Sequence, residues 1–115
     1  MPGARPGLAR AAPPAGAQSA LLTAYQAAVS SRLRQNHRYP RDLKRRGIGG
    51  AGRVEVRIAR DGRLLAWRLV ESAGHPGLDE AIARLIERTA PFPPFPPDLE
   101  RESIRFSFAV RFTRR

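Results

Sequence analysis

The stretch 53-RVEVRIARDGRLLAWRLV-70 decides the fold, because apolar residues recur at every second position on either side of Asp61-Gly62. This period is typical of β-strands with one wet face. Asp-Gly is a favoured pair for a tight two-residue hairpin turn, so two antiparallel strands are expected. The residues expected to face the core are Val54, Val56 and Ile58 on the first strand and Leu65, Trp67 and Leu69 on the second.

A third strand is predicted at the end of the chain, where the stretch 104-IRFSFAVRFT-113 alternates without interruption. One side of this strand carries Ile104, Phe106, Phe108, Val110 and Phe112, and the other carries Arg105, Ser107, Ala109, Arg111 and Thr113. Its core side is therefore strongly apolar and its outer side polar.

Helical spacing precedes and separates these strands. From a predicted N-cap at Ser19, apolar residues recur three and four positions apart, and this helix cannot continue far past Arg38 because of Pro40. A short helix opens at Pro40 and ends at Gly47, and residues 48–52 (IGGAG) are predicted to form a loop. A third helix, residues 77–89, carries an apolar stripe. The apolar positions of the first and third helices are Leu22, Tyr25, Val29 and Leu33, and Leu78, Ala81, Ile82, Leu85 and Ile86.

The order helix, short helix, strand, strand, helix, strand predicts an α+β fold. We expect a small two-layer domain with a three-stranded antiparallel or mixed sheet covered by helices. If helix 77–89 simply carries the chain back, the last strand lies beside the first; a further crossing would place it beside the second. Either order leaves residues 104–113 at a sheet edge, which is a row of unpaired N–H and C=O groups.

Composition limits the organisation of the chain. Its 115 residues suffice for one domain, predicted at 20–115, while the Ala-, Gly- and Pro-rich residues 1–19 are expected to form a flexible arm. The formal charge of +11 favours polyanions without specifying one, and a solvated basic face is an equal alternative. No apolar run approaches the roughly 20 residues of a membrane span.

The proline-rich segment 90-APFPPFPPDL-99 has two interpretations. It could be an exposed ligand for proline-recognising domains, or an internal strut. At three residues per turn of a polyproline helix, Phe92 and Phe95 lie on the same side, and this favours the strut.

Catalytic and metal-binding groups are not arranged in this sequence, so we expect a non-enzyme without cofactor or metal. His37 and His75 have no partner carboxylate at fixed spacing, and there is no cysteine. Asp79 is explained by its place in the first turn of a helix, where the helix dipole favours anions.

The combined pattern resembles the C-terminal domain of the TonB family of periplasmic energy transducers. The similarity rests on YPRDLKRRGI (39–48), on residues 52–97 with their Asp-Gly, Ser-x-Gly and Phe-Pro-Pro elements, and on IRFSFAVRFT. Two features depart from the family: the loop GIGGAGRV (47–54) is about two residues longer, and the membrane anchor and most of the Pro-rich linker are missing, as expected for a fragment.

What the resemblance implies is a binding module. It would be the soluble periplasmic domain of an inner-membrane-anchored protein driven by an ExbB/ExbD-type motor. It would bind the TonB box of outer-membrane transporters as an added strand, for example in siderophore or iron uptake. The implied partner-binding residues are Arg105, Phe106, Ser107, Phe108, Ala109, Val110 and Arg111 on the last strand, with Gln35 and Asn36 before the Tyr-Pro pair.

Two other function classes stay open on the sequence. One is a TolA-like envelope linker that contacts a different periplasmic protein. The other is a nucleic-acid-binding domain, which is supported only by the charge and is not expected, since the order of elements does not match a double-stranded-RNA domain. Weak self-association through the apolar edge strand is a further expectation.

Overall fold

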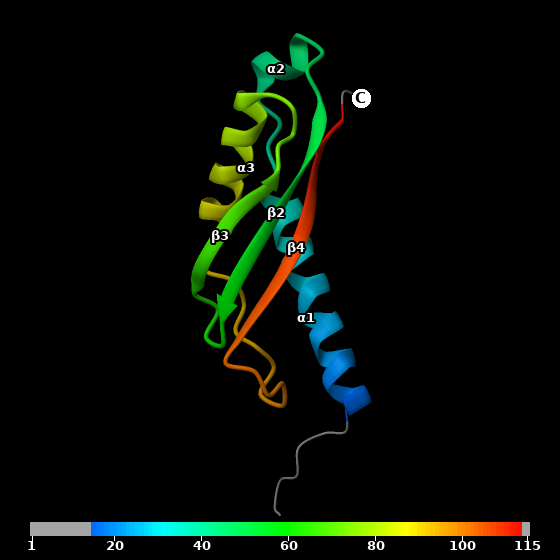
Figure 1. Cartoon of the computed structure of the whole chain (residues 1–115), viewed down its shortest axis with the longest axis vertical. Helices are drawn as coiled ribbons and strands as arrows, with labels where there is room; N and C mark the ends of the chain where they lie inside the picture. Colours follow the sequence, from blue (N-terminus) through cyan, green and yellow to red (C-terminus); the bar gives the residue numbers. More distant parts are fainter. Residues whose placement is uncertain (1–14, 114–115) are drawn as a thin grey trace, which may run out of the picture.

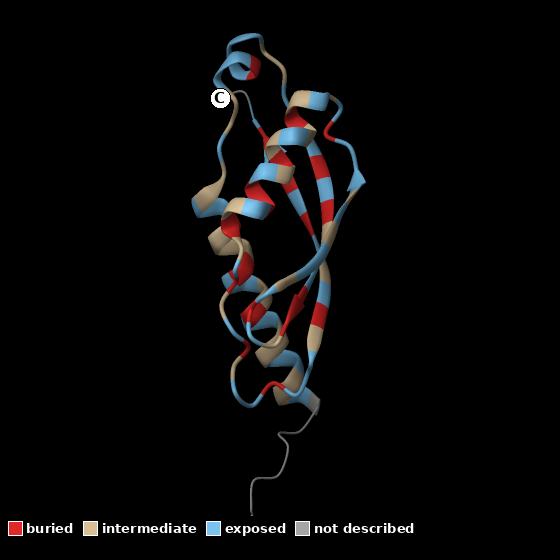
Figure 2. Ribbon diagram, turned by 90° about the vertical axis from the view of Figure 1, so that its left-hand side faces the viewer, coloured by how far each residue is buried: buried red, intermediate tan, exposed pale blue. Residues whose placement is uncertain are grey.

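The computed structural model describes residues 15–113 as an α+β domain, which confirms the predicted fold class. The elements are α1 (Ala15–Asn36), α2 (Arg41–Arg45), β2 (Gly50–Ala59), β3 (Leu64–Glu71), α3 (Pro76–Thr89) and β4 (Ser103–Phe112). The sheet has the order β3-β2-β4 with both pairs antiparallel, so β4 lies beside β2 and at an edge. Both long helices cover the same face of this sheet (Figures 1 and 2).

The core lies between the sheet and the helices, and the predicted alternation of β2 and β4 is confirmed. Val54, Val56 and Ile58 are fully buried, and each stands opposite an apolar residue of β4. On the two long helices, the buried apolar residues are Tyr25, Val29 and Leu33 of α1 and Leu78, Ile82, Leu85 and Ile86 of α3. Each helix therefore presents one apolar stripe to the sheet.

The hairpin between β2 and β3 differs from the prediction in its loop. Ala59 N–H donates to Arg63 O at 2.9 Å, so three residues, not two, separate the paired positions. Gly62 has φ 95°, the left-handed conformation that closes such a three-residue loop. Asp-Gly thus marks the turn correctly, but glycine occupies the bulge position that follows a turn instead of the turn itself.

The strand β3 carries two bulges that correct its predicted core face. Its register with β2 skips Leu65 and Val70, which are the exposed large apolar residues of the described chain at 43% and 42%. Leu64, not Leu65, packs against the core beside Trp67 and Leu69. A one-residue bulge shifts every following side chain to the other face, and the sequence pattern alone does not reveal it.

Two predicted boundaries also move. The strand β2 begins at Gly50, inside the predicted loop, because Gly50, Ala51 and Gly52 continue the ladder with β4. The helix α1 begins at Ala15, not after Ser19, so residues 15–19 are helical and not part of a flexible arm. The rest of that predicted arm lies outside the described residues.

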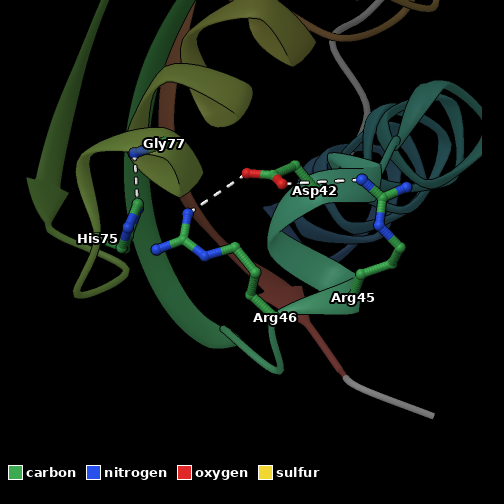
Figure 3. A network of polar contacts seen from close by, with 5 residues as sticks. All are labelled: Asp42, Arg45, Arg46, His75 and Gly77. Carbon is green, nitrogen blue, oxygen red and sulfur yellow. Dashed lines mark hydrogen bonds and ion pairs between the residues drawn. The ribbon is translucent and has the colours of Figure 1, made fainter.

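The short helix α2 packs against the start of α3 (Figure 3). Pro40 precedes α2 as its N-cap, and Gly47 ends it with φ 74°. Asp42 pairs with Arg45 and Arg46 at 3.8 and 3.3 Å, while His75 Nδ1 accepts from Gly77 N–H at 2.9 Å and caps α3. A Cβ on Gly77 would lie 2.8 Å from Cδ1 of Leu43, so α2 and the start of α3 are in close contact here.

The proline-rich segment is an internal strut, as expected. Phe92 and Phe95 are buried, and Phe95 meets the ring of Tyr25 edge-on at 5.0 Å between centroids. The backbone of the segment is tied to the hairpin loop, because Phe92 N–H donates to Gly62 O at 2.9 Å and Phe95 N–H donates to Arg60 O at 3.0 Å. The Arg60 guanidinium reaches further along the chain and donates to the carbonyls of Pro97, Leu99 and Arg101 at 2.7–3.0 Å.

Among residues 15–113, no helix combines the length and the apolar character that crossing a membrane requires.

Replacing both Phe92 and Phe95 with Ala should strongly destabilise the domain, since truncating one buried Phe costs about 3 to 5 kcal/mol. Urea unfolding followed by circular dichroism measures the loss. Pro94→Ala, at an exposed position of the same segment, is the control and should change the free energy of unfolding by less than about 1 kcal/mol. A double variant that unfolds with the wild-type midpoint would contradict the strut.

The phenol of Tyr25 should make the domain sensitive to alkaline pH. Burial raises the pKa of Tyr25 to about 12, against the opposing field of Arg32, and its hydroxyl donates to Pro93 O at 2.6 Å. A raised folded-state pKa means that the stabilisation is complete below pH ~10 and is lost as pH rises towards 12. Urea unfolding at about pH 9 and pH 11.5 should therefore show a larger loss for wild type than for Tyr25→Phe. Equal losses in the two proteins would contradict this account.

Candidate functional site

The free edge of β4 is the feature that most resembles a binding site. Within residues 15–113, β4 pairs with β2 on one side and with no strand on the other. Its register with β2 runs without a shift from Gly50↔Phe112 to Ala59↔Ser103, whereas the opposite edge, β3, is interrupted by two bulges. Bulges blunt an edge against further pairing, so the regular edge is the one able to accept another strand.

The hydrogen-bond alternation of the ladder determines which residues of β4 offer their backbone at this edge. Arg60 N–H donates to Glu102 O at 3.0 Å, which makes this directly opposed pair a hydrogen-bonded one. Because such pairs alternate with non-hydrogen-bonded ones, the even-numbered residues 104–112 turn their backbone groups towards β2. The odd-numbered residues turn theirs to the free edge: Arg105, Ser107, Ala109 and Arg111.

Side chains follow the same division of β4. Ile104, Phe108, Val110 and Phe112 are buried in the core and Phe106 partly so, while Arg105, Ser107, Ala109 and Arg111 are exposed. The exposed side chains thus belong to the residues whose backbone also faces outward. Of the predicted site residues of β4, only Arg105, Ser107, Ala109 and Arg111 therefore offer their backbone and side chains outward. Phe106, Phe108 and Val110 turn their backbone groups to β2 and their side chains towards the core.

A groove of about 690 Å³ runs along this edge between β4 and α1. Its β4 wall consists of residues 107–111, and apolar side chains of Leu33 and Leu85 also line it. On the α1 side, the groove is also lined by Ser30 and Arg34 of the helix and by His37 directly after its end, none of which sequence reasoning selected as a site residue. Their spacing of four and three, beside the apolar stripe, is the signal that could have placed them on one helix face.

His37 is the residue of this wall with an unsatisfied polar atom. Its ring lies against Phe112, with centroids 4.8 Å apart and planes tilted by 38°. Its Nε2 is buried, and no group among the described residues is within hydrogen-bonding reach of it. Because leaving a buried polar atom unpaired costs free energy, this atom would gain from a ligand in the groove.

Gln35 and Asn36, the two helix residues predicted for the site, do not line the groove. Asn36 Nδ2 donates to Arg32 O of its own helix at 2.9 Å, and Gln35 is exposed. Helical geometry explains the difference, since neighbouring residues diverge by about 100° and the groove wall is built by residues 30, 34 and 37.

Two arginines fix the position of α1 against α3 and so the width of the groove. Arg88 of α3 donates to Asn36 O at the end of α1, and Arg32 of α1 donates to Thr89 O at the end of α3, at 2.5 and 3.3 Å. Each helix C-terminus thus receives a cation from the other helix, where the dipole favours positive charge.

The remaining candidate groups have structural roles. Asp79 accepts from Ala73 N–H at 2.7 Å and from Ser72 Oγ at 2.6 Å, which ties the start of α3 to the end of β3. His75 is the N-cap of α3. Within the described part of the chain, no group of three or more His, Asp or Glu side chains is arranged to hold a metal ion.

The sequence of the chain is similar to one family of known proteins. The family model described as TonB C terminal matches residues 22–112. Protein TonB of Pseudomonas putida is 30% identical over 88 residues, which are 76% of this chain and 36% of that protein. The chain therefore spans about a third of the length of this curated relative.

Two solved structures extend the comparison. The C-terminal domain of TonB from Helicobacter pylori superposes with a TM-score of 0.68 at 22% identity, covering 91% of this chain and 95% of that one, which is a likeness of fold. The HasB CTD superposes with a TM-score of 0.51 at 35% identity, covering 76% of this chain and 68% of that one.

Proposed function

The chain belongs to the TonB C-terminal family, and from this premise we propose that it binds the N-terminal TonB box of an outer-membrane transporter as a strand added to β4. The family is one of protein interaction, so the prediction that the chain is not an enzyme is confirmed. Identifying the peptide that binds would identify the transporter and, through it, the cargo.

The observation that carries the proposal is the regular, unpartnered edge of β4 opening into a groove. Main-chain groups of the odd-numbered residues 105–111 face this edge, and an added strand would pair with them. Proteins normally blunt an exposed edge unless pairing is its purpose.

The groove also indicates the side chains that the bound peptide would carry. Side chains of an added strand alternate between the two faces of the sheet. Those turned towards the helices would meet Leu33, Leu85 and His37, which favours apolar residues with one polar group. Those turned outward would lie beside Arg105 and Arg111, which favours acidic residues and a salt-dependent affinity.

The rest of the proposal concerns the whole protein. In it, this domain would lie in the periplasm and be anchored in the inner membrane, and an ExbB/ExbD-type motor would supply the force that the bound box transmits to the transporter. Siderophore or iron uptake would be a typical outcome. These statements rest on the similarity to TonB proteins, of which the chain covers the part described above.

Replacing Ser107 with Pro should abolish box binding while leaving the ladder with β2 intact. Ser107 turns its N–H to the free edge, so proline removes a donor that the fold does not use. Titration of the labelled domain with a transporter's N-terminal peptide should shift the amides of residues 104–113 in wild type and in the Ser107→Ala control. In the proline variant these shifts should largely vanish.

Ala109→Pro is a second variant for the same test, since Ala109 has the same orientation. Circular dichroism first establishes that each variant is folded. If a folded proline variant binds as tightly as wild type, or if the shifts fall on α3, strand addition at β4 is wrong.

The two neighbours Asn36 and His37 should respond differently. Asn36→Ala should alter box affinity by at most about 1 kcal/mol, because the Asn36 amide already donates to a carbonyl of its own helix.

His37→Phe keeps an aromatic ring against Phe112 but removes the unpaired Nε2. The free domain should therefore be as stable as wild type or more so, while its affinity for the box falls about fivefold. Calorimetry measures both. A larger loss from Asn36→Ala, or unchanged affinity of His37→Phe, would shift the contact away from the groove.

A further inference from the structure

We propose that the outer face of the sheet is a second docking surface, which binds an acidic segment of a protein partner through side chains and without strand pairing at β4. We call it the arginine face. It consists of the outward side chains of all three strands, on the side of the sheet opposite α1 and α3 (Figure 2).

The arginine face is strongly basic, and its uncharged residues are Ala and Ser. Its exposed or partly exposed residues are Ala51, Arg53, Glu55 and Arg57 on β2, Ala66, Arg68 and Glu71 on β3, and Arg105, Ser107, Ala109 and Arg111 on β4. Five arginines thus face two glutamates, and no helix or loop of the described chain covers them. This excess of cations concentrates part of the basic charge of the chain on one face of the sheet.

The centre of the arginine face opposes two like charges. Arg57 stands directly opposite Arg105, and the alternation of the ladder makes this a non-hydrogen-bonded pair. Side chains approach each other most closely at such pairs, with Cα atoms about 4.5 Å apart. Like charges directly opposite on one face oppose folding, and a bound anion would remove the repulsion.

The pairing on the arginine face leaves these cations available. Arg68 pairs with Glu55 at 3.0 Å and Arg53 with Glu71 at 3.7 Å. Within residues 15–113, Arg57, Arg105 and Arg111 have no carboxylate partner. Arg57 and Arg105 line a hollow of about 360 Å³ together with Glu55, Ala66, Trp67 and Arg68. Three cationic side chains and one anionic side chain therefore line the hollow.

The chemistry of the face favours carboxylates on a peptide over a lipid surface. Guanidinium groups can take carboxylates in a planar fork, and two glutamates of the face already form ion pairs with neighbouring arginines, each through a single Nε–Oε1 contact. A bilayer is held more firmly when apolar side chains enter it, but the uncharged residues of the arginine face are Ala and Ser. The exposed Leu65 and Val70 lie at the two bulges of β3, at the opposite edge of the sheet from Arg105 and Arg111.

The test is a titration of the labelled full chain with an acidic probe, a peptide of about ten residues in which Glu alternates with Ser; a matched peptide of Gln and Ser is the neutral control. We expect shifts at the amides of 55–57, 66–68 and 105, and none with the neutral probe. The double variant Arg57→Gln with Arg105→Gln should bind the acidic probe about tenfold more weakly. It should also melt no lower than wild type, because the repulsion is gone.

The control double variant, Arg45→Gln with Arg84→Gln, removes the same charge from exposed positions of α2 and α3. If this control variant loses as much affinity for the acidic probe as the Arg57/Arg105 variant does, net charge alone accounts for the binding and the proposal is overturned. Binding to vesicles of phosphatidylglycerol without binding to the probe would overturn it in favour of a lipid. Shifts confined to the amides of residues 107–111, with none at 55–57 and 66–68, would assign the probe to the β4 edge and overturn the proposal. Failure of a transporter peptide to shift β4 would count against the proposed function only.

Discussion

The contact between the proline-rich segment and the hairpin loop is the constraint on which the rest of the domain depends. After α3 the chain must cross to the far end of the sheet before β4 can run antiparallel to β2. The Arg60 guanidinium reaches three carbonyls of residues 97–101, and the Arg60 and Gly62 carbonyls accept from Phe95 and Phe92 N–H. A Cβ on Gly62 would lie only 2.0 Å from Phe92 O, so the loop and the strut fit only with glycine there. The start of β4, and hence its register along β2, is set by this junction.

The groove needs a second condition, which is the placement of α1. At one end, the exchanged arginines Arg32 and Arg88 join the C-termini of α1 and α3. At the other, the Gln18 amide donates to Asp98 O at 2.8 Å and accepts from Glu100 N–H at 3.0 Å, which fastens α1 to the loop before β4. The helix α1 is therefore held at both ends. It forms a fixed wall of the groove beside β4, and no strand of the described chain occupies that groove.

Period and turn chemistry predicted much of this arrangement, and their failures have physical causes. Alternation in residues 54–58 and 104–112 gave the correct core faces because both strands are regular. The same reasoning failed at Leu65, since a bulge leaves no trace in an alternating sequence. It also failed at Gly50–Gly52, where composition suggests a loop although the ladder continues. For the site, the edge position of β4 followed from the order of elements, whereas the groove wall from Ser30 to His37 depends on how α1 is rotated, which only tertiary packing fixes.

The division of β4 into two sets of residues separates two kinds of selection. Even-numbered positions supply the ladder and the core, so substitutions there are limited by folding. Odd-numbered positions supply an outward side chain and a free main-chain edge, and any residue other than proline preserves that edge. Preference for one peptide over another can therefore evolve at Arg105, Ser107, Ala109 and Arg111 with little cost in stability. A strand built in this manner can acquire new partners while its scaffold remains unchanged.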